Sequence, residues 1–279
     1  MGGGELERLA RQAAAGDSAA LSRLVEEVQH PVYRLALRFL GRPEDAKDAT
    51  QEVLVRLITH LGQFEGRSQF MTWAYTIAMR QLLRTRKRQL ESAVKGAEAF
   101  AAALDQGLAD RDFTADEAEY RLLSAEVRIS CTYAMLLCLS RPLRASYILG
   151  DAMGMPDTVA AEICGITPAA QRQRLARARR TTRAIIAKRC GLVDAANPCR
   201  CARQIQTGLD AGILDRDNLA FATHPRTDSG LIETDTIQRA AEQLDLVLAM
   251  SEVYRSDPSF AAPHDVWERV KAACPDLLA

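Results

Sequence analysis

Aromatic and basic side chains are concentrated in residues 67–90 of this sequence. Helical spacing places Phe70, Trp73 and Ile77 on one face of that stretch. Its charge is about +6 by sequence count, and it contains no acid. Because cations neutralise phosphates and aromatic rings stack on unpaired bases, the stretch suits a nucleic acid. The plainer interpretation stays open, since aromatics at this spacing are more often core and a basic run is usually a solvated face.

A second basic stretch, residues 168–189, has a charge of about +8 by count and again no acid. It follows residues 157–166, whose pattern predicts a helix-turn-helix, with Thr167 as helix cap and Pro168 as first helical residue. A helix in the major groove presents its first turns to base edges, where arginine matches guanine and glutamine matches adenine. The candidate DNA contacts are Gln171, Arg172, Gln173 and Arg174 for bases, and Arg177 and Arg179 for phosphates.

Three cysteines near one another in the sequence, Cys190, Cys199 and Cys201, form with His224 a candidate metal site. Thiolates and imidazoles are ligands of zinc and softer metals. The spacing lacks the two-residue gap between cysteines that marks the strong zinc patterns. A redox-sensitive thiol pair and free thiols without a role are the alternatives. The sequence indicates no other cofactor.

The sequence carries no catalytic motif. The four histidines, His30, His60, His224 and His264, have no nucleophile or carboxylate pattern near them, and no glycine-rich phosphate loop is present. We therefore expect a binding protein and not an enzyme.

The composition favours helices. The chain has 279 residues with 36 bases and 36 acids, so its formal net charge is zero. The alternation of β-branched residues that marks strands is scarce, which favours an all-α fold. The charge is nevertheless segregated, because residues 91–119 and residues 191–279 each carry about −6 by count.

The sequence predicts a cytoplasmic protein without membrane contact. Its first residues lack the apolar core of a signal peptide, and no stretch approaches the length of a membrane span. Seven cysteines, an odd number, fit a reducing compartment better than a disulfide scaffold.

Local signals position the helices that would carry these residues. The sequence predicts a first helix over residues 5–16 and a second that Asp17 or Ser18 caps and that stops at Gly41. Pro31 inside the second helix predicts a kink or a break. Pro43 begins a third helix of about 43–62, with acids in its first turn.

Residues 64–90 resemble the promoter-melting segment of the extracytoplasmic-function sigma factors of bacterial RNA polymerase. The resemblance rests on Phe64, Gly66, Ser68, Phe70, Thr72, Trp73, Tyr75, Ile77 and Ala78, followed by the basic end. Upstream, Asp48, Gln51, Glu52 and Val53 match the segment with which the family docks on the polymerase clamp. The chain departs from the family pattern at Arg80 and Arg84, where Asn and Asp are usual, and at Gln171, where an aliphatic core residue is usual.

The resemblance implies a function and its site residues. Such a protein binds core RNA polymerase through the β′ clamp and β flap and directs initiation at promoters with −10 and −35 elements. An anti-sigma factor is a further candidate partner. The resemblance assigns polymerase docking to Asp48, Gln51 and Glu52. Recognition of the −10 element falls on Arg67, Ser68, Trp73, Arg80, Arg84, Arg86, Lys87 and Arg88. Recognition of the −35 element falls on the helix-turn-helix residues named above.

The resemblance also implies an organisation into two small helical domains. We expect a first domain at residues 1–90, a flexible acidic linker at 91–118, and a second domain at 119–190. Residues 191–279 match nothing in the family and have helical patches near 200–212, 233–254 and 263–273.

Two alternatives to the sigma factor interpretation remain from the sequence. The chain could be a stand-alone helix-turn-helix regulator that never binds polymerase, or an interaction protein whose sigma-like parts have decayed. Under the sigma factor interpretation, the acidic extension at 191–279 is expected to act in cis on the sigma module. It would either cover the basic helices or pack on the second domain and support it.

Overall fold

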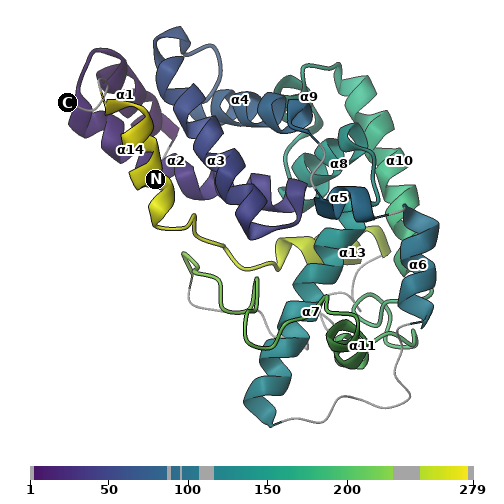
Figure 1. Ribbon diagram of the computed structural model, residues 1–279. Helices are drawn as coiled ribbons and strands as arrows, with labels where there is room; N and C mark the ends of the chain where they lie inside the picture. The colour runs from purple at the N-terminus through teal and green to yellow at the C-terminus, as the bar shows by residue number, and fades with distance from the viewer. Residues whose placement is uncertain (1–2, 87–88, 95, 107–115, 229–245, 276–279) are drawn as a thin grey trace.

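The computed structural model describes residues 3–86, 89–94, 96–106, 116–228 and 246–275. Within these residues the regular structure is helical, and the only β pairing is two isolated bridges, Cys190 with Cys199 and Arg226 with Phe260. The all-α prediction is therefore confirmed (Figure 1).

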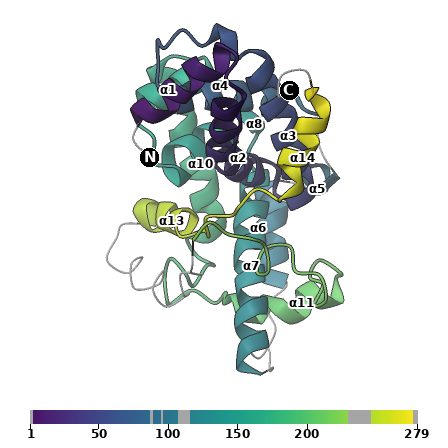
Figure 2. The same cartoon turned by 90° about the vertical axis from the view of Figure 1, so that its left-hand side faces the viewer.

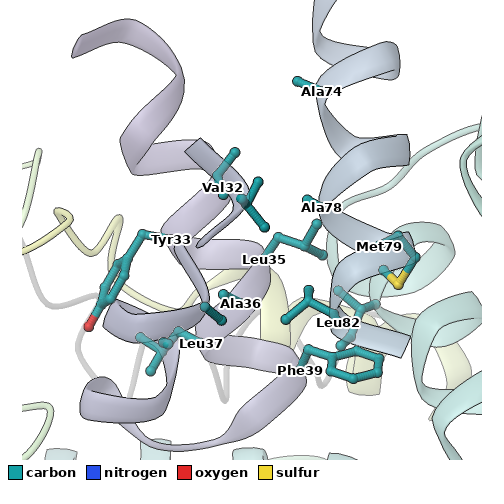
Figure 3. Close-up of a cluster of buried hydrophobic side chains, with 14 of the residues drawn as sticks. Val32, Tyr33, Leu35, Ala36, Leu37, Phe39, Ala74, Ala78, Met79 and Leu82 are labelled. Carbon is teal, nitrogen blue, oxygen red and sulfur yellow. The ribbon is translucent and has the colours of Figure 1, made fainter. Parts of the chain in front are cut away.

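Four helices form the first part of the molecule: α1 (Gly3–Ala14), α2 (Ser18–Leu40), α3 (Pro43–Thr59) and α4 (Phe70–Arg84). The predicted caps hold, since the Asp17 carboxylate accepts from the Ala20 amide over 2.9 Å and Gly41 ends α2 with a left-handed φ of 79°. The predicted break at Pro31 is wrong, because α2 continues through it. Buried residues of α2 and α4, among them Leu35, Phe39, Ala78 and Leu82, meet in the core (Figure 3).

The segment expected to be a flexible linker has structure in its first part. It forms α5 (Gln89–Ala93) and α6 (Ala97–Gln106), and α6 packs against the helix-turn-helix. Glu91 is buried, which a solvated tether would not require. Residues 107–115 of the expected linker lie outside the described residues.

The second part comprises α7 (Glu117–Leu137), α8 (Arg141–Tyr147), a π-helical turn η2 (Ile148–Ala152), α9 (Asp157–Cys164) and α10 (Pro168–Ile186). It packs directly on the first part, through α4 against α9 and α2 against α7. Buried residues of both parts belong to one continuous apolar cluster.

The C-terminal extension contains η3 (Cys201–Gln204), α11 (Ile205–Asp210), α13 (Leu246–Arg255) and α14 (Asp265–Ala273). These elements confirm the helical patches expected near 200–212 and 263–273. Of the patch expected at 233–254, residues up to 245 lie outside the described part. Figure 2 shows the chain crossing the molecule from α13 beside α10 to α14 beside α3.

Candidate nucleic-acid interface

The start of α4 is fixed by aromatic packing and by a contact from α1. The rings of Phe64, Phe70 and Trp73 lie with centroids 5.1–5.5 Å apart. The Phe70 amide donates to the Glu7 carboxylate over 2.8 Å, which replaces the cap that Gln69 does not supply. Trp73 is partly buried in this cluster, so its indole packs against the core while part of the ring stays exposed to solvent.

The cations assigned to this element lie at the surface. Arg80, Arg84 and Arg86 are exposed, and Arg80 and Arg84 are one turn apart on the same helix face. Arg67, in the loop that Gly66 turns with a φ of 72°, has 85% of its side chain exposed and pairs with Glu65. Lys87 and Arg88 lie outside the described residues. Ser68 is half-buried at the end of the loop.

The residues assigned to polymerase docking lie along α3, and two of them already have partners. Glu52 is exposed and accepts a hydrogen bond from Gln81 of α4 over 2.6 Å. Asp48 has 51% of its side chain exposed and lies 3.7 Å from Arg269 of α14. Gln51, which lies between these two residues in the sequence, is half-buried. The contact from α14 was not predicted from the sequence.

The helix-turn-helix forms as predicted. Gly165 ends α9 with a left-handed φ of 64°, and the Thr167 hydroxyl accepts from the Ala170 amide over 3.2 Å at the start of α10. Leu175 and Ala178 are buried on the inner side of α10. The outer side presents Arg172, Gln173, Arg177, Arg180 and Arg183, all exposed, with Arg174 half-buried beside them.

Gln171 does not belong to the DNA-facing set, which corrects the prediction from the sequence. Its side chain is fully buried, and its Nε2 donates to the Ser146 carbonyl over 3.2 Å. Its Oε1 is buried without a hydrogen-bond partner. The residue occupies the core position where the family pattern has an aliphatic side chain.

Arg179 is also engaged inside the protein. Its guanidinium forms two hydrogen bonds with the Asp151 carboxylate, at 3.0 and 2.6 Å. These bonds raise the pKa of Arg179 and orient α10 on η2. Arg179 therefore has an internal carboxylate partner, whereas Arg177 is exposed, and the predicted phosphate contacts of both stay predictions.

An arginine–glutamate cluster joins the two parts of the molecule, and the sequence did not indicate it. Arg141 and Arg144 both donate to Glu91, at distances of 2.6–3.2 Å. Arg144 is 1% exposed and also donates to the Phe39 carbonyl of α2 over 2.8 Å. Burial opposes ionisation of Glu91, but the two guanidinium groups outweigh it and lower the pKa of Glu91.

The predicted metal ligands do not come together as one site. Cys190, Cys199 and Cys201 line, with Cys131 of α7, a cavity of about 330 Å³ between α7, the end of α10 and η3. His224 lies elsewhere: its ring stacks on Tyr33 of α2, with centroids 5.4 Å apart, and hydrogen-bonds the Tyr33 hydroxyl over 3.0 Å.

The thiols that line this cavity are buried. Burial raises the pKa of Cys190 to about 11 and that of Cys201 to about 12. Within the described ranges no three His, Cys, Asp or Glu side chains are arranged to hold a metal ion. No helix in the part of the chain that the structure describes is long and apolar enough to span a membrane.

Comparisons with known proteins converge on one family. Residues 24–91 match the family model described as Sigma-70 region 2. The chain is 32% identical over 114 residues to the RNA polymerase sigma-H factor of Pseudomonas aeruginosa, covering 41% of this chain and 51% of the relative. It is 30% identical over 98 residues to the ECF RNA polymerase sigma factor SigW of Bacillus subtilis, covering 33% and 52%. The match thus spans about half the length of these two relatives.

A longer match has lower identity. The RNA polymerase sigma factor NccH of Alcaligenes xylosoxydans xylosoxydans is 28% identical over 183 residues, which cover 64% of this chain and 94% of that protein. Among solved structures, that of CnrH in complex with the cytosolic domain of CnrY is similar with a TM-score of 0.46 and 22% identity, over 66% of this chain and 97% of that one.

Proposed function

We propose, on the premise that this chain belongs to the extracytoplasmic-function sigma factors, that it binds core RNA polymerase and directs promoter-specific initiation of transcription. The match to Sigma-70 region 2 includes both α3 and α4. The proposed activity is that of a polymerase subunit which selects and opens DNA, while the polymerase carries out the reaction. The chain itself then performs no covalent chemistry, and its proposed compartment is the cytoplasm.

One observation carries the proposal. The chain combines the region 2 match with a helix-turn-helix whose outer face presents exposed arginines. A stand-alone regulator needs only the second of these. A protein that reads two promoter elements needs both, one for unpaired bases and one for duplex DNA.

The proposed division of labour follows the two parts of the molecule. Residues 1–90 would dock on the polymerase clamp through Asp48, Gln51 and Glu52 and capture the opened −10 element with α4 and its preceding loop. Residues 119–190 would read the −35 element, with Arg172 and Gln173 on bases and Arg177 on phosphate. Residues 91–118 would connect them, and residues 191–279 would regulate them.

The cations of α4 and of the residues that follow it support the proposed capture of a melted strand. Arg80, Arg84 and Arg86 are exposed, and no acidic residue lies next to them in the sequence. Their guanidinium groups are therefore available to bind phosphates. Trp73 offers a ring at the start of the same helix, and stacking on it would offset part of the cost of unstacking a base.

The test is reconstitution with core polymerase. Purified chain is mixed with core enzyme, the mixture is resolved by gel filtration, and run-off transcripts from genomic fragments are sequenced. The proposal expects co-elution and transcripts that share upstream elements about 25 base pairs apart, as the −10 and −35 positions require. Binding of duplex DNA by the chain alone, without co-elution, would instead identify a stand-alone regulator.

A further inference from the structure

We propose that residues 246–275 form an internal inhibitor, which packs against the proposed polymerase-docking helix α3 near Lys47 and Asp48 and holds the two DNA-binding parts together in a closed state. This inference rests on the proposed function, because it concerns access to the same surfaces. It differs from both sequence-based expectations, in which the extension would either cover the basic helices or pack on the second domain to support it.

The first argument is where α14 lies. Val266 and Val270 are fully buried, and the helix packs against α3 and α2. Its polar side pairs with α3: Lys47 lies 2.7 Å from Asp265, and Asp48 lies 3.7 Å from Arg269. Asp48 is one of the proposed docking residues. A polymerase surface that approaches α3 at Lys47 and Asp48 would therefore meet α14 there first (Figure 2).

The second argument is that α13 bridges the two parts of the molecule. Tyr254 is fully buried, and its hydroxyl donates to the Thr132 carbonyl of α7 over 3.2 Å. Its own carbonyl accepts from Arg38 of α2 over 3.4 Å, and its ring contacts that of Tyr147 in α8 with centroids 5.4 Å apart. One residue of the extension thus touches helices of both parts.

Other residues of the extension also contact helices of one part or the other. Arg255 donates to the carbonyl of Asp151 over 2.9 Å, within the η2 turn whose Asp151 carboxylate binds Arg179 of α10. Asp257 pairs with Arg128 of α7 inside the protein, at 3.4 Å. On the other part, the Ala262 amide donates to His30 of α2 over 2.9 Å. The extension is therefore attached to both parts of the molecule, to α2 of the first and to α7, α8 and η2 of the second.

The third argument is the size of a promoter. Elements at −10 and −35 are separated by about 25 base pairs, which is about 85 Å of duplex at 3.4 Å per base pair. In this structure α4 packs directly against α9, and α9 packs against the proposed −35 reading helix α10, so only one helix separates the two proposed reading helices. The chain must open to engage both elements, and the contacts of α13 on α2 and α7 must separate when it does. The tether keeps the extension at a high effective concentration, which favours the closed state until polymerase or a signal competes.

The experiment measures core polymerase affinity and domain separation in the full chain. In V266D/V270D, buried carboxylates displace α14 from α3. In D265K, an exposed residue of the same helix is made to repel Lys47, which tests the contact without disturbing the core. E268Q is the matched control, because Glu268 pairs with Lys271 on α14 itself. Circular dichroism establishes that each variant is folded, and energy transfer between dyes on α4 and α10 reports opening.

If the closed state is populated about ten to one, its release raises apparent affinity about tenfold, since apparent affinity scales with the competent fraction. We expect that gain for V266D/V270D, a two- to fivefold gain for D265K, and none for E268Q. The distance between the dyes should increase most in V266D/V270D, less in D265K, and not at all in E268Q. Equal affinity of all four proteins, or weaker binding by folded D265K, would overturn the inhibition while leaving the proposed function intact. Failure of every variant to bind polymerase would overturn the proposed function, and the inhibition with it.

Discussion

Gln81 of α4 donates a hydrogen bond to Glu52 of α3, with Nε2 and Oε2 2.6 Å apart. The bond joins the helix proposed to dock on polymerase to the helix proposed to capture the melted strand. The carboxylate proposed to contact polymerase is thereby linked directly to the helix that carries the proposed DNA-binding cations. Docking and strand capture would then occur on one rigid unit.

This pair gives a first prediction. Replacement of Glu52 by Ala should weaken binding to core polymerase by about 1 kcal/mol, or roughly fivefold, because an exposed interfacial charge is lost. Gln81→Ala is the control, since it removes the hydrogen bond and keeps the carboxylate, and it should change affinity less than twofold. Affinity can be measured by fluorescence anisotropy of labelled chain. An equal loss in both variants would show that Glu52 acts through its internal bond and not as a docking group.

Arg80 and Arg84 should contact phosphates of the opened strand. Alanine at both positions should lower the slope of log affinity against log salt by about 1.5, because each phosphate contact contributes about 0.7–0.9. Sequence preference should be unchanged, since phosphates carry no base identity. Open-complex formation by the holoenzyme is measured over a salt series. Arg11→Ala, at an exposed arginine of α1, is the control, and a double variant with the parent's slope would exclude the contact.

Arg172 should read a base. It is exposed in the first turns of α10, where an arginine can form two hydrogen bonds with guanine. Arg172→Ala should cost about 1–3 kcal/mol at one base pair of the −35 element and leave the others unaffected. Arg177→Ala should weaken all sites uniformly and reduce the salt slope. Binding to a panel of single-base variants of the site distinguishes a base contact from a phosphate contact. If Arg172→Ala lost the same affinity for every variant of the site, Arg172 would be a phosphate ligand.

Gln171 should influence stability and not recognition. Leucine has nearly the same volume and carries no polar atom, so Gln171→Leu removes the buried, unpartnered Oε1 at the cost of one hydrogen bond to the Ser146 carbonyl. An unpartnered buried acceptor costs about 1–3 kcal/mol and a hydrogen bond contributes about 0.5–1.5, so the variant should be about 1 kcal/mol more stable. Thermal unfolding tests this. Gln173→Leu, on the exposed side, should lose DNA affinity instead, and a loss of affinity in Gln171→Leu would return that residue to the DNA interface.

Local sequence signals predicted the helix boundaries well. Asp17, Gly41 and Thr167 form the caps expected of them, and Pro43 and Pro168 begin their helices. Such signals act over a few residues, so the sequence contains everything that decides them. Pro31 is the exception, because packing on both sides of α2 compensates for its missing amide donor.

Tertiary pairing was not predictable in the same way. The count of charges favoured docking of the acidic extension on basic helices, yet α14 lies on α3. Charge attracts without selecting a geometry, whereas Val266 and Val270 form an apolar stripe that requires a matching surface. Similarly, nothing near His224 in the sequence indicates Tyr33, which lies 191 positions away. The burial of Gln171 was signalled only by the aliphatic residue that the family places there.

Glu91 should make the stability of the chain depend on pH in the acid range. Its pKa is lower in the folded protein than the ordinary value of 4.5, because Arg141 and Arg144 together outweigh its burial. The stabilisation is therefore complete above pH 4.5 and is lost as the pH falls through the lower, folded pKa. Glu91→Gln removes the charge and leaves the buried Arg144 without its carboxylate, which should cost about 3 kcal/mol at pH 7.

Urea unfolding at pH 7, 5 and 3.5 gives the difference in unfolding free energy between the parent and Glu91→Gln. This gap should be constant from pH 7 to 5 and smaller at pH 3.5, because protonated Glu91 resembles glutamine. Glu98→Gln, an exposed acid of α6, is the control and should show a gap below about 0.5 kcal/mol throughout. A gap in Glu91→Gln that stays the same at all three values would mean that the hydrogen-bond geometry, and not the charge of Glu91, joins the two parts. A gap that widens toward acid would contradict the lowered pKa itself.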